Sequence, residues 1–195
     1  MDLDKMQADI LDEMLPSSSF TDADAATLAA HRQLLLDFGD DLVEGFYDTL
    51  YHHDRTAAVF EPGERAAREQ TLRQWWERTV EGPLDRGYWT WMALVGIVHI
   101  RRGVGNPMML SMIGYVQNAV HDHAVACGLD PAEVERLRLA FSHLGTTVSA
   151  VISDSYTQSY IGALQNLGGL NPRLLANMLG IEIQAIEDAG RASLS

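Results

Sequence analysis

The chain reads as a series of amphipathic helices separated by turn residues. Apolar residues recur every three or four positions, as in Met6, Ile10 and Met14, which places them on one face of a helix. Such helices are predicted over residues 4–15, from Thr21 to about Phe38, from Leu42 to Tyr51, from Glu64 to about Val80, around Tyr88 to His99, from Asn106 to about Ala126, from Pro131 to about Leu167, and over about 172–189. No alternating strand pattern and no internal repeat stands out, so the sequence predicts an all-α fold with about seven or eight helices.

Capping residues mark several of the predicted helix ends. Thr21 has the position of an N-cap, with Asp24 at the third helical position. Asn106-Pro107 and Asp130-Pro131 each place a capping residue before a proline, which is favoured in the first helical turn. Gly168-Gly169 ends the longest predicted helix. Together these signals predict where the helices from 21, 106 and 131 begin.

Composition and charge narrow the class of protein. Hydrophobic residues make up 47% of the 195 residues, which is enough for a sizeable core. The formal net charge of −13 argues against nucleic acids and anionic membranes as partners, because phosphate groups bind basic surfaces. The sequence has no long apolar run and no signal-peptide pattern, and its single cysteine, Cys127, excludes an internal disulfide. We therefore expect a cytoplasmic protein.

The strongest candidate for chemistry is His99, which lies in the segment Leu94–Gly103 (LVGIVHIRRG). Aliphatic residues surround it on the predicted helix, so this helix is expected to be largely buried. A buried imidazole needs a partner, because an unpaired buried polar group costs a few kcal/mol. That partner is either a backbone carbonyl, which is the more common case, or a metal ion or a metal-bearing cofactor.

The remaining histidines lack such surroundings and are expected at the surface or in structural contacts. They are His31, His52, His53, His121, His123 and His143. Neighbouring pairs among them fall on different faces of a helix, since two positions correspond to roughly 200° around the axis. The sequence also contains no His-Glu-x-x-His zinc motif, no phosphate-binding loop and no repeated Glu-x-x-His pattern of a di-iron bundle.

Two arginines, Arg101 and Arg102, follow His99 in a chain with only 14 basic residues. A histidine on the wall of an apolar cavity, with arginine near the mouth, suits a flat apolar cofactor that bears carboxylates. Haem is such a cofactor, and histidine is one of its usual axial ligands. Large apolar side chains occur nearby, but plain hydrophobic core is the simpler explanation for most of them: Phe46, Tyr47, Trp75, Trp76, Met108, Met109 and Met112.

The chain resembles the globin-coupled sensor and protoglobin family over roughly residues 20–165. The matching segments are Glu81–Trp89 (EGPLDRGYW), Gly96–Val104 (GIVHIRRGV) and Pro107-Met108-Met109. Upstream, Phe46–Leu50 (FYDTL) is similar to the second-helix motif of the family. The histidine segment is the more specific of these, and Met108 and Met109 stand where the family often has aromatic residues.

This resemblance implies a globin fold with an extra N-terminal helix and an additional C-terminal helix, and it implies b-type haem. It makes His99 the proximal iron ligand and Tyr47 the distal residue, whose hydroxyl can donate a hydrogen bond to bound O₂. Either Thr71 or Leu72 faces the iron from the distal side, and Arg101 either pairs with a propionate or is solvated. The cofactor-binding residues implied in this way are Phe46, Tyr47, Arg68, Thr71, Leu72, Trp75, Val95, His99, Arg101, Val104, Met108, Met109 and Met112, with His99 as the metal ligand.

The function implied by the resemblance is reversible binding of O₂, CO or NO by a gas sensor. We expect a haem domain over residues 1–167 and a helical extension over 168–195, with any output in a separate signalling partner. Family likeness also implies a homodimer formed through helices 106–126 and 131–167. Two alternatives stay open: a haem enzyme that turns over NO or peroxide with Arg68 as its distal group, and a cofactor-free globin-like signalling module.

Overall fold

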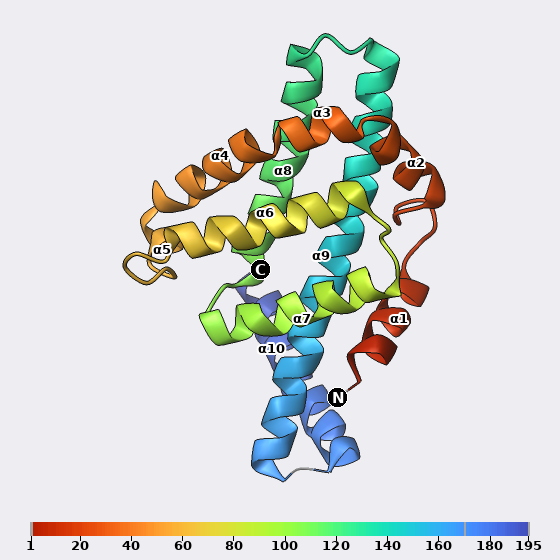
Figure 1. Cartoon of the computed structure of the whole chain (residues 1–195). Helices are drawn as coiled ribbons and strands as arrows, with labels where there is room; N and C mark the ends of the chain where they lie inside the picture. The colour runs from red at the N-terminus through yellow and green to blue at the C-terminus, as the bar shows by residue number, and fades with distance from the viewer. Residues whose placement is uncertain (1, 170, 195) are drawn as a thin grey trace. The chain divides into compact units, whose positions relative to one another are not determined.

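The structure is a computed structural model that describes residues 2–169 and 171–194, and the regular elements in these ranges are all helices. They are α1 (Leu3–Glu13), α2 (Asp22–Ala30), α3 (Arg32–Asp37), α4 (Gly39–Tyr51), α5 (Asp54–Ala57), α6 (Arg65–Glu81), α7 (Arg86–Arg102), α8 (Asn106–Ala126), α9 (Pro131–Gly168) and α10 (Pro172–Ser193) (Figure 1). The predicted all-α class is confirmed. The chain forms two compact units, residues 1–156 and 157–195, which divide within α9.

In the first unit, most of the other helices pack on α6, α7 or α8. Helices α3 and α4 pack on α6, α1 packs on α7, and α4 also packs on α8. Helices α8 and α9 are joined by a short turn and run antiparallel (Figure 1). The side chain of Gln117 on α8 donates a hydrogen bond of 3.2 Å to the carbonyl of Phe141 on α9, which ties these two helices together.

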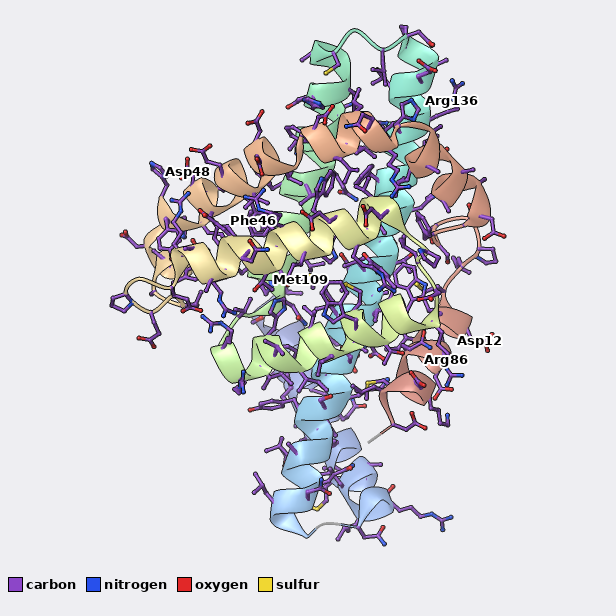
Figure 2. The ribbon with its side chains drawn as sticks, in the orientation of Figure 1. Asp12, Phe46, Asp48, Arg86, Met109 and Arg136 are labelled. Carbon is purple, nitrogen blue, oxygen red and sulfur yellow. The ribbon has the colours of Figure 1, made fainter. Side chains whose placement is uncertain are left out.

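The core of this unit follows the predicted apolar stripes. Seven apolar residues that recur at helical spacing along α9 are all buried: Val134, Leu137, Phe141, Leu144, Val148, Val151 and Ile152. Trp76 of α6 stacks on Phe141 with 5.7 Å between ring centroids, and its indole nitrogen donates a hydrogen bond to the carbonyl of Leu35. Figure 2 shows Phe46 and Met109 among the helices and Asp12 and Arg136 at the periphery. Each large apolar side chain buried in this way stabilises the folded state by about 1.5–3 kcal/mol relative to an exposed side chain.

Glycine at position 96 allows α7 to approach α9 closely. A Cβ atom at Gly96 would lie 2.5 Å from the carbonyl oxygen of Ile152 and closer still to the hydroxyl of Ser155. Real Cβ atoms do not come this close to such neighbours, so a larger residue would push the helices apart. Because Gly96 lies one turn before His99, this contact also fixes where His99 sits along α9.

The predicted start signals are largely confirmed. Thr21 and Asp24 form a capping box at the start of α2, and the Asp130 carboxylate accepts hydrogen bonds from the amides of Ala132 and Glu133 at the start of α9. Helix α8 differs by one position, because Gly105 is its N-cap and Asn106 is already helical. Proline at the second helical position lacks an amide that would have no partner there in any case.

Three helix boundaries differ from the predicted ones. The single helix expected from Thr21 to Phe38 is two helices, because the backbone of His31 leaves the helical region with φ −106° and ψ 15°. The next helix, expected from Leu42, begins earlier, because α4 starts at Gly39 directly after Phe38. Helix α5 was not predicted, since four residues are too few to show a hydrophobic period. The described ranges therefore hold ten helices instead of the expected seven or eight.

The extra N-terminal helix, α1, packs against α7. Asp4 of α1 accepts a hydrogen bond of 2.5 Å from the hydroxyl of Thr90 and forms an ion pair of 3.0 Å with Arg86. Met6 and Ile10, two members of the predicted apolar stripe, are buried, whereas Met14 lies just beyond the end of the helix. Helix α1 thereby supports the helix that carries His99.

The second unit consists of the last part of α9 and of α10. Asn171 caps α10, and its side chain accepts a hydrogen bond of 2.9 Å from the amide of Arg173. Many apolar side chains of this unit are exposed, among them Leu164, Leu174 and Ile181. Within residues 2–169 and 171–194, no helix is both long enough and apolar enough to cross a membrane.

Candidate cofactor-binding site

A cavity of about 330 Å³ lies inside the first unit, between α4, α6, α7 and α8, with two residues of α9 in its wall. This volume is typical of small-molecule sites. Most of the lining side chains are apolar or aromatic. The polar groups among them are few, and the ionisable ones are Tyr47, Arg68, His99 and Arg102. The cavity therefore suits a largely apolar ligand that carries a small number of polar groups.

His99 lines this cavity from the last turn of α7. The helix begins at Asp85, whose carboxylate accepts a hydrogen bond of 3.0 Å from the amide of Tyr88, and it ends at Gly103 in the left-handed conformation, with φ 70°. Val95 lies one turn before His99 and Arg102 nearly one turn after it, so all three project from the same face.

The imidazole of His99 makes no hydrogen bond with any other residue of the described chain. Burial, and secondly the positive charge of Arg102, lower the pKa of His99 below its ordinary value of 6.5. The ring is therefore neutral at pH 7, and a neutral imidazole has a nitrogen lone pair that can bind a metal ion. His99 therefore has no hydrogen bond to a backbone carbonyl of the described chain, although a carbonyl is the common partner of a buried histidine.

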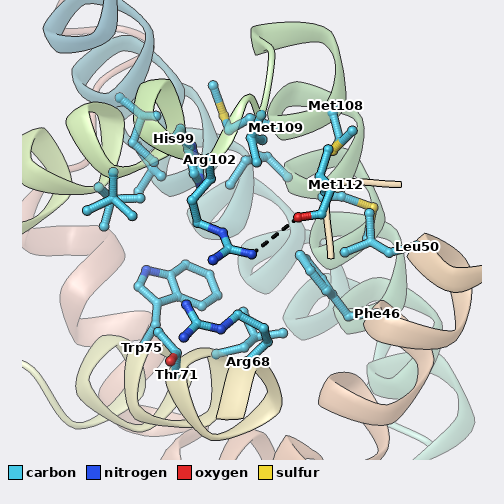
Figure 3. Close-up of a pocket in the computed structure, with 18 of the residues that line it drawn as sticks. Phe46, Leu50, Arg68, Thr71, Trp75, His99, Arg102, Met108, Met109 and Met112 are labelled. Atoms are coloured by element: carbon cyan, nitrogen blue, oxygen red, sulfur yellow. Dashed lines mark hydrogen bonds between the residues drawn. The ribbon is translucent and has the colours of Figure 1, made fainter. Parts of the chain in front are cut away.

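Four residues of α6 form the facing wall at helical spacing. They are Arg68, Thr71, Leu72 and Trp75, and all four line the cavity. Leu72 is partly buried, whereas Thr71 is more exposed and its hydroxyl donates a hydrogen bond of 3.0 Å to the carbonyl of Ala67. Figure 3 shows Thr71 and Trp75 on this side of the cavity, with His99 on the other.

Tyr47 enters the cavity from α4, next to Phe46. Its hydroxyl donates a hydrogen bond of 2.9 Å to the backbone carbonyl of Arg68, and burial raises the pKa of Tyr47 above its ordinary value. The phenol is thus protonated at any physiological pH and is a hydrogen-bond donor only in that form. The ring of Phe60 packs edge-on against Tyr47, at 5.9 Å between centroids.

Methionines at the start of α8 provide another part of the wall. Met108, Met109 and Met112 all line the cavity, as does Val104 in the preceding turn. Met109 and Met112 are buried. Methionine side chains are flexible and polarisable, so this wall can adapt to the shape of a ligand.

The structure brings twelve of the thirteen predicted cofactor-binding residues to one cavity, and Arg101 is the one that it leaves out. Arg101 is exposed to solvent, whereas Arg102 lines the cavity and donates a hydrogen bond of 3.2 Å to the carbonyl of Val59 (Figure 3). The signal for Arg102 was present in the sequence, because a residue three positions after His99 shares its helix face.

The sequence reasoning missed several apolar lining residues. They are Leu50, Val59, Phe60, Trp91, Met92, Leu94, Val98, Ile113, Val116, Val148 and Ile152. Helical spacing from His99, in steps of four, could have indicated Trp91, which lies on the same face as Val95 and His99. Val59 and Phe60 follow the short helix α5 in a segment without periodicity, and no local pattern indicated them.

The described side chains of this site cannot bind a metal ion by themselves. The described residues contain no group of three or more His, Cys, Asp or Glu side chains that could hold a metal ion together. His99 supplies one ligand, so an ion bound there must bring its remaining ligands with it. Haem meets this condition because its macrocycle supplies four nitrogens, and its carboxylates suit the arginines at the edge of the cavity.

Four of the other histidines make the structural contacts expected of them, His53 is exposed, and the Nδ1 atom of His121 is buried without a hydrogen-bond partner in the described chain. His31 and His52 are within hydrogen-bond distance of backbone carbonyls in their own helical segments, those of Thr27 and Asp48, and His143 pairs with Asp24. His123 stacks on Phe38. None of these rings lines the cavity.

Comparison with known proteins places the chain in a family. The family model of Protoglobin matches residues 7–161. The chain belongs to the protoglobin family. Among solved structures, this protoglobin-family chain is similar to the globin domain of a Geobacter sulfurreducens globin-coupled sensor, with a TM-score of 0.65 and 23% identity. The match covers 78% of this chain and 95% of that chain, and it confirms the predicted globin fold. No curated protein matches the sequence.

Proposed function

We propose that this member of the protoglobin family binds b-type haem in the cavity through His99 and binds a diatomic gas reversibly, as a gas sensor. One observation carries the proposal: a neutral imidazole without a hydrogen bond faces an apolar cavity whose edge carries two arginines. Membership of the protoglobin family supports it.

Each part of the site has a distinct role in this proposal. Haem supplies an iron that binds O₂, CO or NO. His99 holds the iron through a ring nitrogen, and Arg68 and Arg102 hold the carboxylates. The apolar wall formed by residues such as Phe46, Leu72 and Met109 excludes water from the gas-binding side.

Tyr47 is proposed as the hydrogen-bond donor to the gas. Its support is that the phenol lines the cavity and keeps its proton at physiological pH. That proton is directed to the Arg68 carbonyl, so the hydroxyl must turn away from this carbonyl to serve a ligand. When bound by haem, O₂ would become more polarised than CO and would gain more from this donor, which favours O₂ in the competition between the two.

Absorption spectroscopy of protein reconstituted with haem tests the proposal. The wild-type protein is expected to take up one haem per chain with a Soret band, and His99→Ala is expected to lose the iron ligand and shift this band. Added imidazole should restore the wild-type spectrum in the variant, because it can occupy the space left by the side chain. His52→Ala is the matched control, since His52 is exposed and outside the cavity.

Two results would overturn the proposal. One is the absence of a Soret band in correctly folded wild-type protein, which favours the cofactor-free signalling module. The other is a spectrum that His99→Ala leaves unchanged, which shows that the iron has a different ligand. Circular dichroism of both proteins separates these outcomes from loss of folding.

We also propose that the chain forms a homodimer through α8 and α9 and passes its signal to a separate partner. Exposed apolar side chains on these helices support the dimer, among them Leu110, Val125, Leu139 and Leu164. Helix α9 carries Val148 and Ile152 of the cavity wall and continues to Gly168, so one helix leads from the cavity into the second unit. Gel filtration with mass measurement is expected to give twice the chain mass, and a monomer would exclude the dimer.

A further inference from the structure

Two arginines from different helices meet at the edge of the cavity. Arg68 extends from α6 and Arg102 from α7, and Figure 3 shows their guanidinium groups close to one another beside Trp75. Like charges repel at this range, and in an apolar surrounding the repulsion is stronger than in water. A negative group must therefore lie near them.

That negative group is Glu64, the residue that precedes α6. Its Oε1 atom lies 2.5 Å from Nη2 of Arg102 and 2.9 Å from Nε of Arg68. Its Oε2 atom accepts a hydrogen bond of 2.8 Å from the amide of Glu61, which fixes the carboxylate in place. The side chain of Glu64 is only 11% exposed, so solvent screens these ion pairs weakly.

Glu64 differs from the other carboxylates that pair with arginine. In nine other arginine ion pairs of the described ranges, the carboxylate is at least 27% exposed. The pKa of Glu64 is held below its ordinary value, mainly by Arg102 and secondly by the amide of Glu61. The Glu64 carboxylate therefore stays charged at neutral pH. Glu64 is therefore a largely buried carboxylate shared by two arginines that line the cavity.

The pairing leaves Arg68 incompletely satisfied. Its Nε atom is buried and lies near Oε1 of Glu64, which is also buried, but neither atom has a partner with the geometry of a hydrogen bond. A buried donor without a proper acceptor is costly, which favours any carboxylate that can align with it better. Two arginines and one carboxylate also leave one excess positive charge, in a chain whose formal net charge is −13.

We propose that Glu64, which pairs with Arg68 and Arg102 beside the cavity, competes with the carboxylates of the cofactor for these two arginines. The inference rests on the proposed haem function and concerns how tightly haem is held. When haem enters, its carboxylates take over the two arginines and Glu64 turns outward to solvent. Glu64 thus weakens haem retention, while it keeps the two arginines neutralised and ordered in the haem-free protein.

The test compares haem loss from wild-type and variant proteins, measured as transfer of haem to an excess of an apoglobin acceptor. Glu64→Gln removes the charge and keeps the size and the acceptor for Glu61, so it is expected to slow haem loss roughly threefold to tenfold. Arg102→Gln is expected to speed haem loss by a similar factor. Arg101→Gln is the matched control and is expected to have no effect, because Arg101 is exposed and outside the cavity.

A second measurement needs no iron chemistry. Zinc protoporphyrin and its dimethyl ester are titrated into haem-free protein and followed by fluorescence. Glu64→Gln is expected to strengthen binding of the dicarboxylate and to leave binding of the ester unchanged, since the ester has no charge to compete. In the haem-free protein, the same substitution is expected to lower the melting temperature, because both arginines lose their counter-ion.

The outcomes separate this inference from the proposed function. If Glu64→Gln speeds haem loss, Glu64 orients the arginines for the cofactor instead of competing with it, and the inference is wrong. An unchanged rate also overturns it. Absence of haem uptake by the wild-type protein contradicts the proposed function itself, and the titration with zinc protoporphyrin then shows whether the cavity binds the flat dicarboxylate at all.

Discussion

The hydroxyl of Tyr47 donates a hydrogen bond of 2.9 Å to the backbone carbonyl of Arg68. This contact joins α4 to α6 across the end of the cavity that both residues line. A phenol has one proton, so Tyr47 cannot donate to Arg68 and to a gas ligand at the same time. The contact therefore sets the free-energy difference that a ligand must overcome to recruit Tyr47.

Replacement of Tyr47 tests this competition directly. In haem-reconstituted protein, Tyr47→Phe is expected to raise the O₂ dissociation rate about fivefold to tenfold, since a hydrogen bond in a dry pocket contributes about 1–1.5 kcal/mol. The CO dissociation rate should change less. Stopped-flow or flash-photolysis measurements give both rates.

The control for this prediction is Tyr88→Phe. Tyr88 is also a buried tyrosine, but its hydroxyl is 2.9 Å from that of Thr79 and it does not line the cavity. Its substitution is expected to lower stability and to leave the O₂ rate unchanged. If Tyr47→Phe and Tyr88→Phe give the same O₂ rate as the wild type, Tyr47 has no role in ligand binding.

The lowered pKa of His99 predicts how the stability of the haem-free protein depends on pH. The unfolded chain takes up a proton near the ordinary value of 6.5, whereas burial keeps the folded imidazole neutral to lower pH. The unfolded state therefore binds more protons in this window, and stability rises with pH. His99 contributes fully to stability above about pH 6.5, and this contribution is lost as the pH falls through the folded pKa.

The measurement is the free energy of unfolding of wild type and His99→Gln in urea, between about pH 5 and 8. The wild type is expected to lose stability relative to the variant as the solution becomes more acidic. A difference between the two that is constant with pH would mean that the imidazole titrates alike in the folded and unfolded states. Circular dichroism at each pH confirms that both proteins start folded.

The close approach of α7 to α9 at Gly96 predicts that a single added methyl group lowers the stability of the protein. Gly96→Ala is expected to destabilise the protein by about 1–3 kcal/mol, because the added methyl group meets the carbonyl of Ile152 and the hydroxyl of Ser155. Haem retention should also fall, since α7 carries His99 one turn further on.

Gly114→Ala is the matched control for this prediction. Gly114 lies within α8, where an added Cβ would meet nothing within 4 Å, so alanine is expected to stabilise the protein by about 0.5–1 kcal/mol. Urea unfolding of both variants measures the two effects. Equal effects at positions 96 and 114 would show that helix propensity, and not the contact with α9, governs both sites.

Much of the fold could be predicted from local pattern. The stripe from Val134 to Ile152 and the capping box at Thr21 depend only on residues within a few turns of one another, and both are present. The break at His31 was not predicted, because no glycine or proline marks it, and after it α3 packs on α6. Hydrophobic periodicity shows which face of a helix is apolar, but it does not show where the helix axis changes direction.

The sequence by itself determined the helices, the family resemblance and the choice of His99 among seven histidines. Those conclusions depend on neighbours along the chain, and such information is local. Only the tertiary structure decided that Tyr47 donates to the Arg68 carbonyl and that Glu64 lies between two arginines. Most of these contacts join separate helices, and their partners are set by how α4, α6 and α7 pack, which no spacing within a single helix specifies.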